Sequence, residues 1–384
     1  MSSLPTSRFF LPGPTEVRRE VLEAMLRPMI GHRVPEMEEL MGRIQPRLQK
    51  VFQTERPVYV APASGTGMME AGVRNGAIRR VLSLTNGAFS ERFMKIAEAN
   101  GLHVEALALE WGEAHTPEML EEALAGDDFD TVTICHSETS TGALNPINEL
   151  ARVAHEAGDI VVLIDSVSGL SGAPVLTDRW QLDFVLTGSQ KSFALPPGLA
   201  FGVAQVNVLE RAAKQRSRGI YFDFIEYERN ILKNQTPNTP AISLLFALDR
   251  QLELMLEEGI ENRWKRHLAM AQATYGWVAA MRDRGHELSI LAPEGYRSPT
   301  VTTIRCPEGW TGPGVVAAAK GQGFDIASGY GKLRDSTFRI GHMGEHTVAG
   351  VGALLDALTD VFEQGPGAEA GTTPGGARRT QPFA

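Results

Sequence analysis

The chain is dominated by short apolar runs that alternate with helical segments. These runs are rich in β-branched residues and lie at residues 58–60, 81–84, 104–109, 131–134, 160–164, 184–186 and 201–206. Helical segments such as residues 88–100 and 146–157 separate them. Strands that are apolar on both faces and joined by helices are typical of a mainly parallel sheet covered on both sides. The pattern therefore predicts a doubly wound domain of the α/β class.

After about residue 239 the pattern changes to long amphipathic helix, over residues 242–257 and 261–284. Residues 300–305, 324–326 and 337–340 then predict three strands around a helix near 314–321, with a closing helix over 346–362. This is the pattern of a small α+β domain. We predict an N-terminal arm (1–20), a large domain (21–260), a small C-terminal domain (261–364) and a disordered tail (365–384), because the last twenty residues hold five Gly, three Pro and almost no apolar side chains.

The charge of the chain narrows the choice of partners. With 46 acidic and 37 basic side chains, its formal charge of -9 repels nucleic acid and anionic membrane surfaces. Its only cysteines, Cys135 and Cys306, are too few for a disulfide framework and lack the spacing of a metal site. No apolar stretch approaches the roughly 20 residues of a membrane helix. We expect small-molecule partners, no metal, no nucleic acid, no membrane and a cytoplasmic location.

A candidate phosphate site follows the first apolar run, in the segment Ser64-Gly65-Thr66-Gly67. Backbone N–H groups, hydroxyls and the N-terminus of a helix expected to begin near Met68 would favour an anion. Most Gly-Ser turns between a strand and a helix are only turns, so this segment alone does not identify a ligand.

Two charged residues stand at the ends of later apolar runs. Asp165 directly follows residues 160–164, where a carboxylate needs either a cationic partner or a role as a helix N-cap. Lys191 follows residues 184–186 and precedes a proline-containing passage. It is either a solvated loop lysine or an amine that forms an imine with an aldehyde cofactor. A phosphate cradle, an acid for a pyridinium nitrogen and such a lysine together match pyridoxal 5'-phosphate.

Five segments, taken in order, resemble the class V aminotransferases. They are residues 64–67, 136–142 (His-Ser-Glu-Thr-Ser-Thr-Gly), 165–168, 188–191 (Gly-Ser-Gln-Lys) and 338–341 (Phe-Arg-Ile-Gly). The resemblance is to the alanine-glyoxylate and serine-pyruvate branch, and it extends from residue 10 to about residue 362. It implies the fold type I of pyridoxal-phosphate enzymes, with a seven-stranded large domain, a small C-terminal domain and a homodimer whose active sites lie at the interface.

The resemblance also implies roles for individual residues. Lys191 would carry the cofactor and Asp165 would hold its ring nitrogen. Cofactor contacts are implied for Ser64, Gly65, Thr66 and Gln190 (phosphate), Phe89 and Val167 (ring faces), Thr139 (ring hydroxyl), and Asn238 and Thr239 (phosphate of the partner subunit). Two positions depart from the family: Phe89 replaces a tryptophan, and Gln235 stands where a tyrosine is common. An aromatic face suffices for stacking, so the first change leaves cofactor binding intact.

Three further residues have two interpretations each. Arg339 fits a clamp for a substrate α-carboxylate, because guanidinium offers two parallel donors, and its alternative is a structural salt bridge. His136 is interpreted as a packed, hydrogen-bonded residue and not as a base. Arg33 either touches a substrate side chain or is a surface charge at a helix start.

The predicted function is transfer of an amino group from alanine or serine to glyoxylate or pyruvate through Lys191. The alternatives are other reactions of the same cofactor, such as a lyase, a cysteine desulfurase or an aminoethylphosphonate transaminase. A desulfurase needs a mobile cysteine, and neither cysteine stands in a suitable segment. A non-catalytic protein that binds a phosphate ligand is the remaining alternative, which would leave Asp165 and Lys191 without roles.

Overall fold

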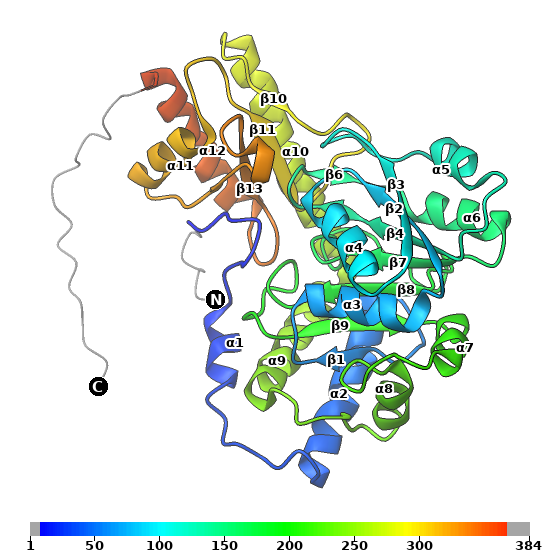
Figure 1. Ribbon diagram of the computed structural model, residues 1–384. Helices are drawn as coiled ribbons and strands as arrows, with labels where there is room; N and C mark the ends of the chain where they lie inside the picture. Colours follow the sequence, from blue (N-terminus) through cyan, green and yellow to red (C-terminus); the bar gives the residue numbers. More distant parts are fainter. Residues whose placement is uncertain (1–7, 367–384) are drawn as a thin grey trace.

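A seven-stranded sheet forms the centre of the protein in the computed structural model, which describes residues 8–366 (Figure 1). The strand order is β1-β9-β8-β7-β4-β2-β3. The strands are β1 (Tyr59–Ala61), β2 (Arg80–Thr85), β3 (His103–Ala108), β4 (Thr131–Cys135), β7 (Val161–Asp165), β8 (Phe184–Gly188) and β9 (Ala200–Ala204). The five strands from β3 to β8 pair in parallel, whereas β9 is antiparallel to both β8 and β1. The prediction of a mainly parallel sheet is confirmed.

The burial of the strands follows their position in the sheet. Every residue of β4, β7, β8 and β9 is buried, as expected for strands covered on both faces. By contrast, β3 is an edge strand that pairs only with β2 and has no buried residue, so the prediction of a strand covered on both faces was wrong for residues 104–109. Helix α3 approaches the sheet closely at Gly72, where an added Cβ would lie 2.6 Å from Cε1 of Phe184. Glycine at this position therefore allows the contact between helix and sheet.

Helices surround this sheet, and α3 and α4 cross in front of it in Figure 1. They are α1 (Arg19–Ala24), α2 (Pro35–Phe52), α3 (Gly65–Gly76), α4 (Ala88–Ala99), α5 (Pro117–Leu124), α6 (Ile147–Ala157), α7 (Val206–Lys214), α8 (Phe224–Ile231) and α9 (Ile242–Glu258). A short hairpin, β5 (Ser137–Glu138) and β6 (Ala143–Leu144), follows β4.

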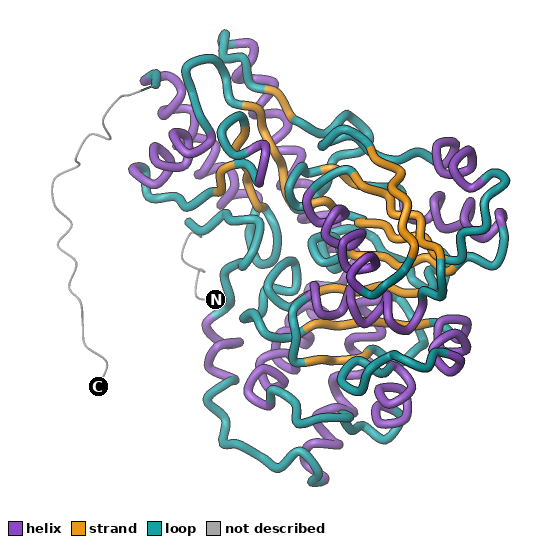
Figure 2. Tube along the Cα trace, in the orientation of Figure 1, coloured by secondary structure: helices purple, strands orange, loops and turns teal. Residues whose placement is uncertain are grey.

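A second, antiparallel sheet of order β10-β11-β13-β12 follows the long helix α10 (Ile260–Asp283) in the chain. It is separate from the large sheet, as the tube in Figure 2 also shows. Its elements are β10 (Ser289–Ile290), β11 (Val301–Arg305), α11 (Gly312–Gly321), β12 (Ala327–Ser328), a 3-10 turn (Gly331–Leu333), β13 (Thr337–Gly341) and α12 (Val348–Gln364). Each sheet has its own cluster of buried apolar residues. The domain boundaries given above remain a prediction, and from residue 367 on the predicted disordered tail lies outside the described residues.

The prediction for residues 324–326 was wrong in position. These residues pair with the N-terminal arm and not with β13: the Phe10 N–H donates to the Asp325 carbonyl at 2.7 Å, and Phe9 and Asp325 form a parallel bridge. The strand of the small sheet lies just after them, at β12, and the two-residue strand β10 was not predicted.

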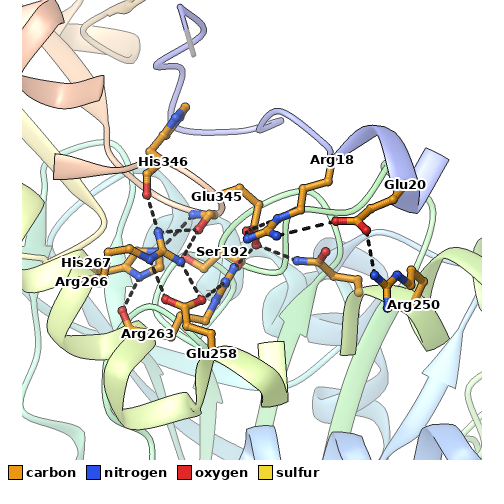
Figure 3. Close-up of polar contacts among 12 residues, drawn as sticks. Arg18, Glu20, Ser192, Arg250, Glu258, Arg263, Arg266, His267, Glu345 and His346 are labelled. Atoms are coloured by element: carbon orange, nitrogen blue, oxygen red, sulfur yellow. Dashed lines mark hydrogen bonds and ion pairs between the residues drawn. The ribbon is translucent and has the colours of Figure 1, made fainter. Parts of the chain in front are cut away.

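A buried network of charges joins α10 to its surroundings (Figure 3). Arg263, 1% exposed at its side chain, bonds Glu258 at 2.9 Å and Glu345 at 2.8 Å. Glu345 also accepts a hydrogen bond from Nε of Arg18 at 2.6 Å. Nη2 of Arg263 donates to the carbonyl of Ser192 at 2.8 Å. The network therefore fixes the segment next to Lys191 to α10 and to the loop before α12.

Candidate active site

The residues singled out after the apolar runs gather at one edge of the large sheet. Thr139 follows β5 in the hairpin after β4, Asp165 ends β7 and Lys191 follows β8, while α3 and α4 begin at the same edge. One cavity there is lined by Ser64, Gly65, Thr66, Met69, Phe89, Arg92, Ser137, Thr139, Asp165, Val167, Ser168, Gln190 and Lys191. Parallel strands meet with their carboxyl ends at one edge, which explains how distant segments form a single site.

Lys191 is buried, with 8% of its surface exposed, so the interpretation as a solvated loop lysine is wrong. Its Nζ donates to the carbonyl of Pro12, and its own carbonyl accepts from the Thr15 hydroxyl at 3.0 Å. Gly13 beside it has a φ of 94°, which favours glycine, and an added Cβ would lie 2.4 Å from Cδ of the lysine. Burial, with a smaller contribution from the positive charge of Arg339, lowers the pKa of Lys191 to about 8.

Asp165 is buried at the end of β7 and has no cation within hydrogen-bond distance among residues 8–366. Its Oδ1 accepts from the Val167 N–H at 2.8 Å, and Oδ2 lies 3.7 Å from Sγ of Cys135. No α-helix begins here, so Asp165 is not a helix N-cap. Burial raises the pKa of its carboxyl to about 7, which indicates a group that lacks a positive partner.

Ser64, Gly65 and Thr66 line the end of the cavity formed by the start of α3. This helix begins at Gly65, three residues earlier than predicted, and the Ser64 side chain caps it by accepting from the Gly67 N–H at 3.4 Å. An added Cβ on Gly65 would lie 2.6 Å from Cγ2 of Val167. Free N–H groups at a helix start and small side chains suit a phosphate group. Gln190 lines the same cavity.

Phe89 and Val167 line the cavity together with the Thr139 hydroxyl, which lies 2.5 Å from Oγ of Ser168. The position of Phe89 is fixed through its backbone. The buried carboxylate of Glu138 accepts from the N–H groups of Phe89 at 3.1 Å and Ser90 at 2.9 Å. Glu138 therefore satisfies free donors at the start of α4.

Arg339, in β13, lies beside the cavity. Its Nε donates to the Ser328 carbonyl at 2.9 Å and its Nη1 to the Thr139 carbonyl at 3.2 Å. It forms no ion pair among the described residues, so the alternative of a structural salt bridge is wrong. Nη2 donates to no described group, and burial lowers the pKa of this guanidinium to about 10. A buried cation without a counter-ion is prepared for an anionic ligand.

Arg92 in the cavity lining and Tyr330 beside it were not singled out from the sequence. Arg92 lies 4.7 Å from the ring centre of Phe89 and bonds Oγ1 of Thr66 at 3.3 Å. Tyr330 lies 5.5 Å from the Phe89 ring and 5.6 Å from the guanidinium of Arg339, measured to ring centres. Its hydroxyl is 3.4 Å from Nη2 of Arg92. Neither residue ends a strand, so the strand-end pattern gave no signal for them.

Asn238 and Thr239 are not among the residues that line the cavity. They lie in the loop before α9, where the Asn238 carbonyl accepts from the Thr236 hydroxyl at 2.8 Å and Thr239 is exposed. Arg33 is also exposed and donates to the carbonyl of Thr236 at 2.7 Å. It therefore bonds the same loop and does not reach the cavity of its own chain.

His136 is buried and hydrogen-bonded, as predicted: its Nδ1 lies 2.9 Å from Oγ of Ser166. Cys135 is buried within β4, and burial raises the pKa of its thiol. Burial likewise raises the pKa of the half-buried Cys306 to about 11. Neither thiol has the lowered pKa of a reactive cysteine.

No group of three or more His, Cys, Asp or Glu side chains is placed to hold a metal ion within residues 8–366. No helix there is long and apolar enough to cross a membrane.

Comparison with known proteins assigns a family to this fold and cavity. Residues 81–304, more than half of the chain, match the family described as aminotransferase class-V. An uncharacterized aminotransferase of Methanocaldococcus jannaschii is 39% identical over 87% of each chain. A serine–glyoxylate aminotransferase of Methylorubrum extorquens is 32% identical over 94% of this chain and 92% of its own. The crystal structure of an aspartate aminotransferase from Thermus thermophilus matches with a TM-score of 0.84 at 31% identity, over 92% of this chain and all of its own.

The protein is thus an α/β enzyme with the fold of the pyridoxal-phosphate transferases. It belongs to the class V aminotransferases, which depend on pyridoxal 5'-phosphate, and the family and fold predictions are confirmed. The roles of the individual site residues remain predictions.

Proposed function

We propose that the protein transfers the amino group of a small amino acid, alanine or serine, to a small 2-oxo acid, glyoxylate or pyruvate. The similarity to a serine–glyoxylate aminotransferase supports this substrate class. The observation that carries the proposal is the buried amine of Lys191, with a pKa lowered to about 8, in the same cavity as the unpaired carboxylate of Asp165.

The residues of the cavity fit pyridoxal 5'-phosphate. Asp165 is a buried carboxylate without a cation, and a protonated ring nitrogen would supply that cation. Glycine at position 65 allows the start of α3 to pack against Val167, because an added Cβ would lie 2.6 Å from Cγ2 of Val167. We assign Ser64, Gly65, Thr66 and Gln190 to the phosphate, Phe89 and Val167 to the two ring faces, and Thr139 to the ring hydroxyl. When bound, the cofactor supplies an aldehyde for the lysine and a ring that withdraws electrons from the substrate Cα–H bond.

The proposed task of Lys191 beyond anchoring the cofactor is to move a proton. With a pKa near 8, its Nζ is partly neutral at pH 7 to 8 and can accept a proton from the substrate Cα. Burial excludes bulk water from this transfer. Arg339 would hold the substrate carboxylate through Nη2, since Nε and Nη1 are already bonded to the carbonyls of Ser328 and Thr139.

We also propose that two copies of the chain complete each other's active sites. The reason is the placement of Asn238 and Thr239 on a loop that is absent from the lining of their own cavity. In this arrangement they contact the cofactor phosphate of the partner subunit. A fully active monomer in sedimentation experiments would contradict the arrangement.

The predicted cytoplasmic location accords with the charge and the two thiols of the chain.

A second candidate substrate is a dicarboxylic amino donor such as aspartate. Arg92 favours it, because this guanidinium lines the cavity and forms no ion pair among the described residues. It could bind a distal carboxylate while Arg339 binds the α-carboxylate. The structural match to an aspartate aminotransferase supports this candidate.

The two candidates can be separated with purified holoenzyme. Each donor is mixed with the enzyme in a single half-reaction, and the loss of the cofactor's visible absorption is followed. If alanine or serine is the donor, Arg92→Gln should leave kcat/KM nearly unchanged. If aspartate is the donor, the loss should be about 30-fold or more with aspartate alone, because one charge-assisted contact is removed. Lys95→Gln, an exposed change on the same helix, is the matched control.

Other reactions of the same cofactor would give a different result in that experiment. A lyase or a desulfurase would release product from a donor without converting the cofactor to its amino form, and an aminoethylphosphonate transaminase would accept only a phosphonate donor. The buried Cys135 and the raised pKa of Cys306 argue against a desulfurase. A protein that binds a phosphate ligand without catalysis would leave the absorption unchanged with every donor.

A further inference from the structure

A second cavity, of about 640 Å³, lies where the start of α6, residues 172–180 and the first half of α10 meet (α6 and α10 are labelled in Figure 1). It shares no lining residue with the proposed cofactor cavity. Small-molecule sites usually measure about 300–1,000 Å³. The proposed function gives this cavity no role.

The walls of the second cavity are mainly apolar. Its larger apolar side chains are Leu144, Ile147, Pro174, Trp180, Trp264 and Leu268. Leu268 stays 48% exposed, although leaving apolar surface in water costs about 25 cal/mol per Å². The indole N–H of Trp264 is buried and has no hydrogen-bond partner among the described residues. These walls suit a flat apolar body with a polar substituent.

Two buried polar side chains line this cavity, Asn145, whose amide is hydrogen-bonded within the protein, and His136, which has a free ring nitrogen. His136 is only 3% exposed, and its Nδ1 is bonded to Oγ of Ser166. Its ring lines the cavity, while its Nε2 has no hydrogen-bond partner among residues 8–366. Burial lowers the pKa of this imidazole to about 4, so the ring is neutral at pH 7 and Nε2 offers one hydrogen bond to a ligand. A hydroxyl would suit either tautomer, since it both donates and accepts.

The charged residues of the cavity favour an anion. Lys265 and Arg297 line it together with the single acid Glu261, and none of the three forms an ion pair among the described residues. These three side chains together carry one net positive charge, whereas the formal charge of the whole chain is -9. The first turn of α6 also lines the cavity, and the start of a helix is electropositive.

We propose that the second cavity is a binding site for a small aromatic carboxylate that carries a hydroxyl group. The ring lies between the apolar walls and the carboxylate meets Lys265 and Arg297. The hydroxyl bonds Nε2 of His136. The inference does not depend on the proposed function of the other cavity.

The test is titration calorimetry of the holoenzyme with 4-hydroxyphenylacetate, and we expect one site per chain. Lys265→Glu, which reverses a charge of the cavity, should raise Kd at least about tenfold, and so should Leu268→Glu. Arg282→Glu is the matched control, because Arg282 is an exposed basic residue on the same helix outside the cavity, and Kd should not change. His136→Phe should raise Kd about fivefold, as expected for one lost hydrogen bond.

Variation of the ligand tests the same contacts even if the His136 variant does not fold. Phenylacetate, without the hydroxyl, should bind about fivefold more weakly than 4-hydroxyphenylacetate. The uncharged 4-hydroxyphenylacetamide should bind at least about tenfold more weakly. Equal affinity for the amide would overturn the assignment of the anionic end.

Three other results would overturn the proposal as a whole. One is the absence of binding to the wild-type holoenzyme. A second is binding that Arg339→Lys abolishes and Lys265→Glu leaves unchanged, since the ligand would then occupy the active site. The third is a change of sedimentation coefficient in Leu268→Glu without a change in Kd, which would assign this apolar surface to a second copy of the chain.

Discussion

Two buried groups of charges lie next to each other in this protein and differ in their partners. Lys191, Asp165 and Arg339 have no ion pairs among the described residues, and burial moves each pKa toward the neutral form, to about 8, 7 and 10. Arg263 and Glu345 are equally buried but bonded to each other at 2.8 Å. In this second group the attraction between opposite charges outweighs the effect of burial. The pKa of Glu345 is therefore lowered and that of Arg263 is raised.

The difference teaches that burial alone does not mark a functional charge. A buried charge with a complete set of partners holds parts of the structure together. A buried charge without them costs free energy in the absence of a ligand, and this is the pattern expected of binding and catalytic groups. The carbonyl of Ser192, beside Lys191, bonds Arg263, so the paired group also positions the unpaired one.

The largest expected effect is that of Lys191→Ala. Turnover should fall by at least about 1,000-fold, equivalent to about 4 kcal/mol, and the visible absorption of the lysine-bound cofactor should disappear. The free energy of unfolding of the cofactor-free protein should fall by no more than about 1 kcal/mol, because the amine has no ionic partner and loses only its hydrogen bond to the Pro12 carbonyl. Lys320→Ala, at an exposed lysine, is the control. Transamination retained by the Lys191 variant would contradict its assigned role.

Glu345→Gln should give the opposite result, a loss of stability. Removing one partner leaves Arg263 buried with a single ion pair, and the free energy of unfolding should fall by about 3–5 kcal/mol. Because the folded pKa of Glu345 is lowered, its contribution is complete above the ordinary value of 4.5 and is lost as the pH falls. Urea unfolding at pH 7 and pH 4 should therefore show a smaller difference from wild type at the lower pH.

The control for that change is Glu363→Gln, which breaks an exposed pair with Arg284. It should lower the free energy of unfolding by less than about 1 kcal/mol. Equal effects of the two variants would remove the distinction between buried and exposed pairs.

Asp165→Asn should stabilise the cofactor-free protein while it weakens cofactor binding. The folded pKa of Asp165 is raised from 3.8 to about 7, so over this range the unfolded chain binds fewer protons and the folded state loses stability as the pH rises. The variant lacks this loss and should be more stable at pH 8 by up to about 4 kcal/mol, since a shift of about 3 pKa units is worth about 1.4 kcal/mol per unit. Thermal unfolding from pH 4 to pH 8 measures it. A variant that is less stable than wild type at pH 8 would show that the carboxylate has a partner.

The sequence predicted some residues of the active site and not others. The seven apolar runs predicted the large sheet, and the residues after them predicted Asp165 and Lys191 at one edge, because parallel strands end together. The burial of Lys191 depends on Pro12, 179 residues away, which no local pattern indicates. Arg92 lies on a face of helix α4, whereas Tyr330 lies in a loop of the small domain. Only the packing of the two domains brings these side chains together.

The position of the small strand illustrates the same limit. Residues 324–326 have a strand-like sequence, and Phe324 and Ile326 are buried, but the backbone between them pairs with the N-terminal arm. Apolar pattern predicts burial more directly than it predicts the hydrogen-bonding partner. The paired charges around Arg263 were also not predicted, since an arginine in a helical pattern is ordinarily exposed.

The smallest expected effects compare two helix caps, one inside the proposed cofactor site and one outside it. The Ser64 side chain caps α3 and the Thr116 side chain caps α5, each by accepting one N–H at 3.4 Å. Ser64→Ala and Thr116→Ala should each lower the free energy of unfolding of the cofactor-free protein by about 1 kcal/mol. Only Ser64→Ala should also raise Kd for pyridoxal 5'-phosphate, by about fivefold, because it removes a phosphate contact as well as a cap. Fluorescence titration with the cofactor measures this difference, and equal cofactor affinity in the two variants would make Ser64 a cap alone.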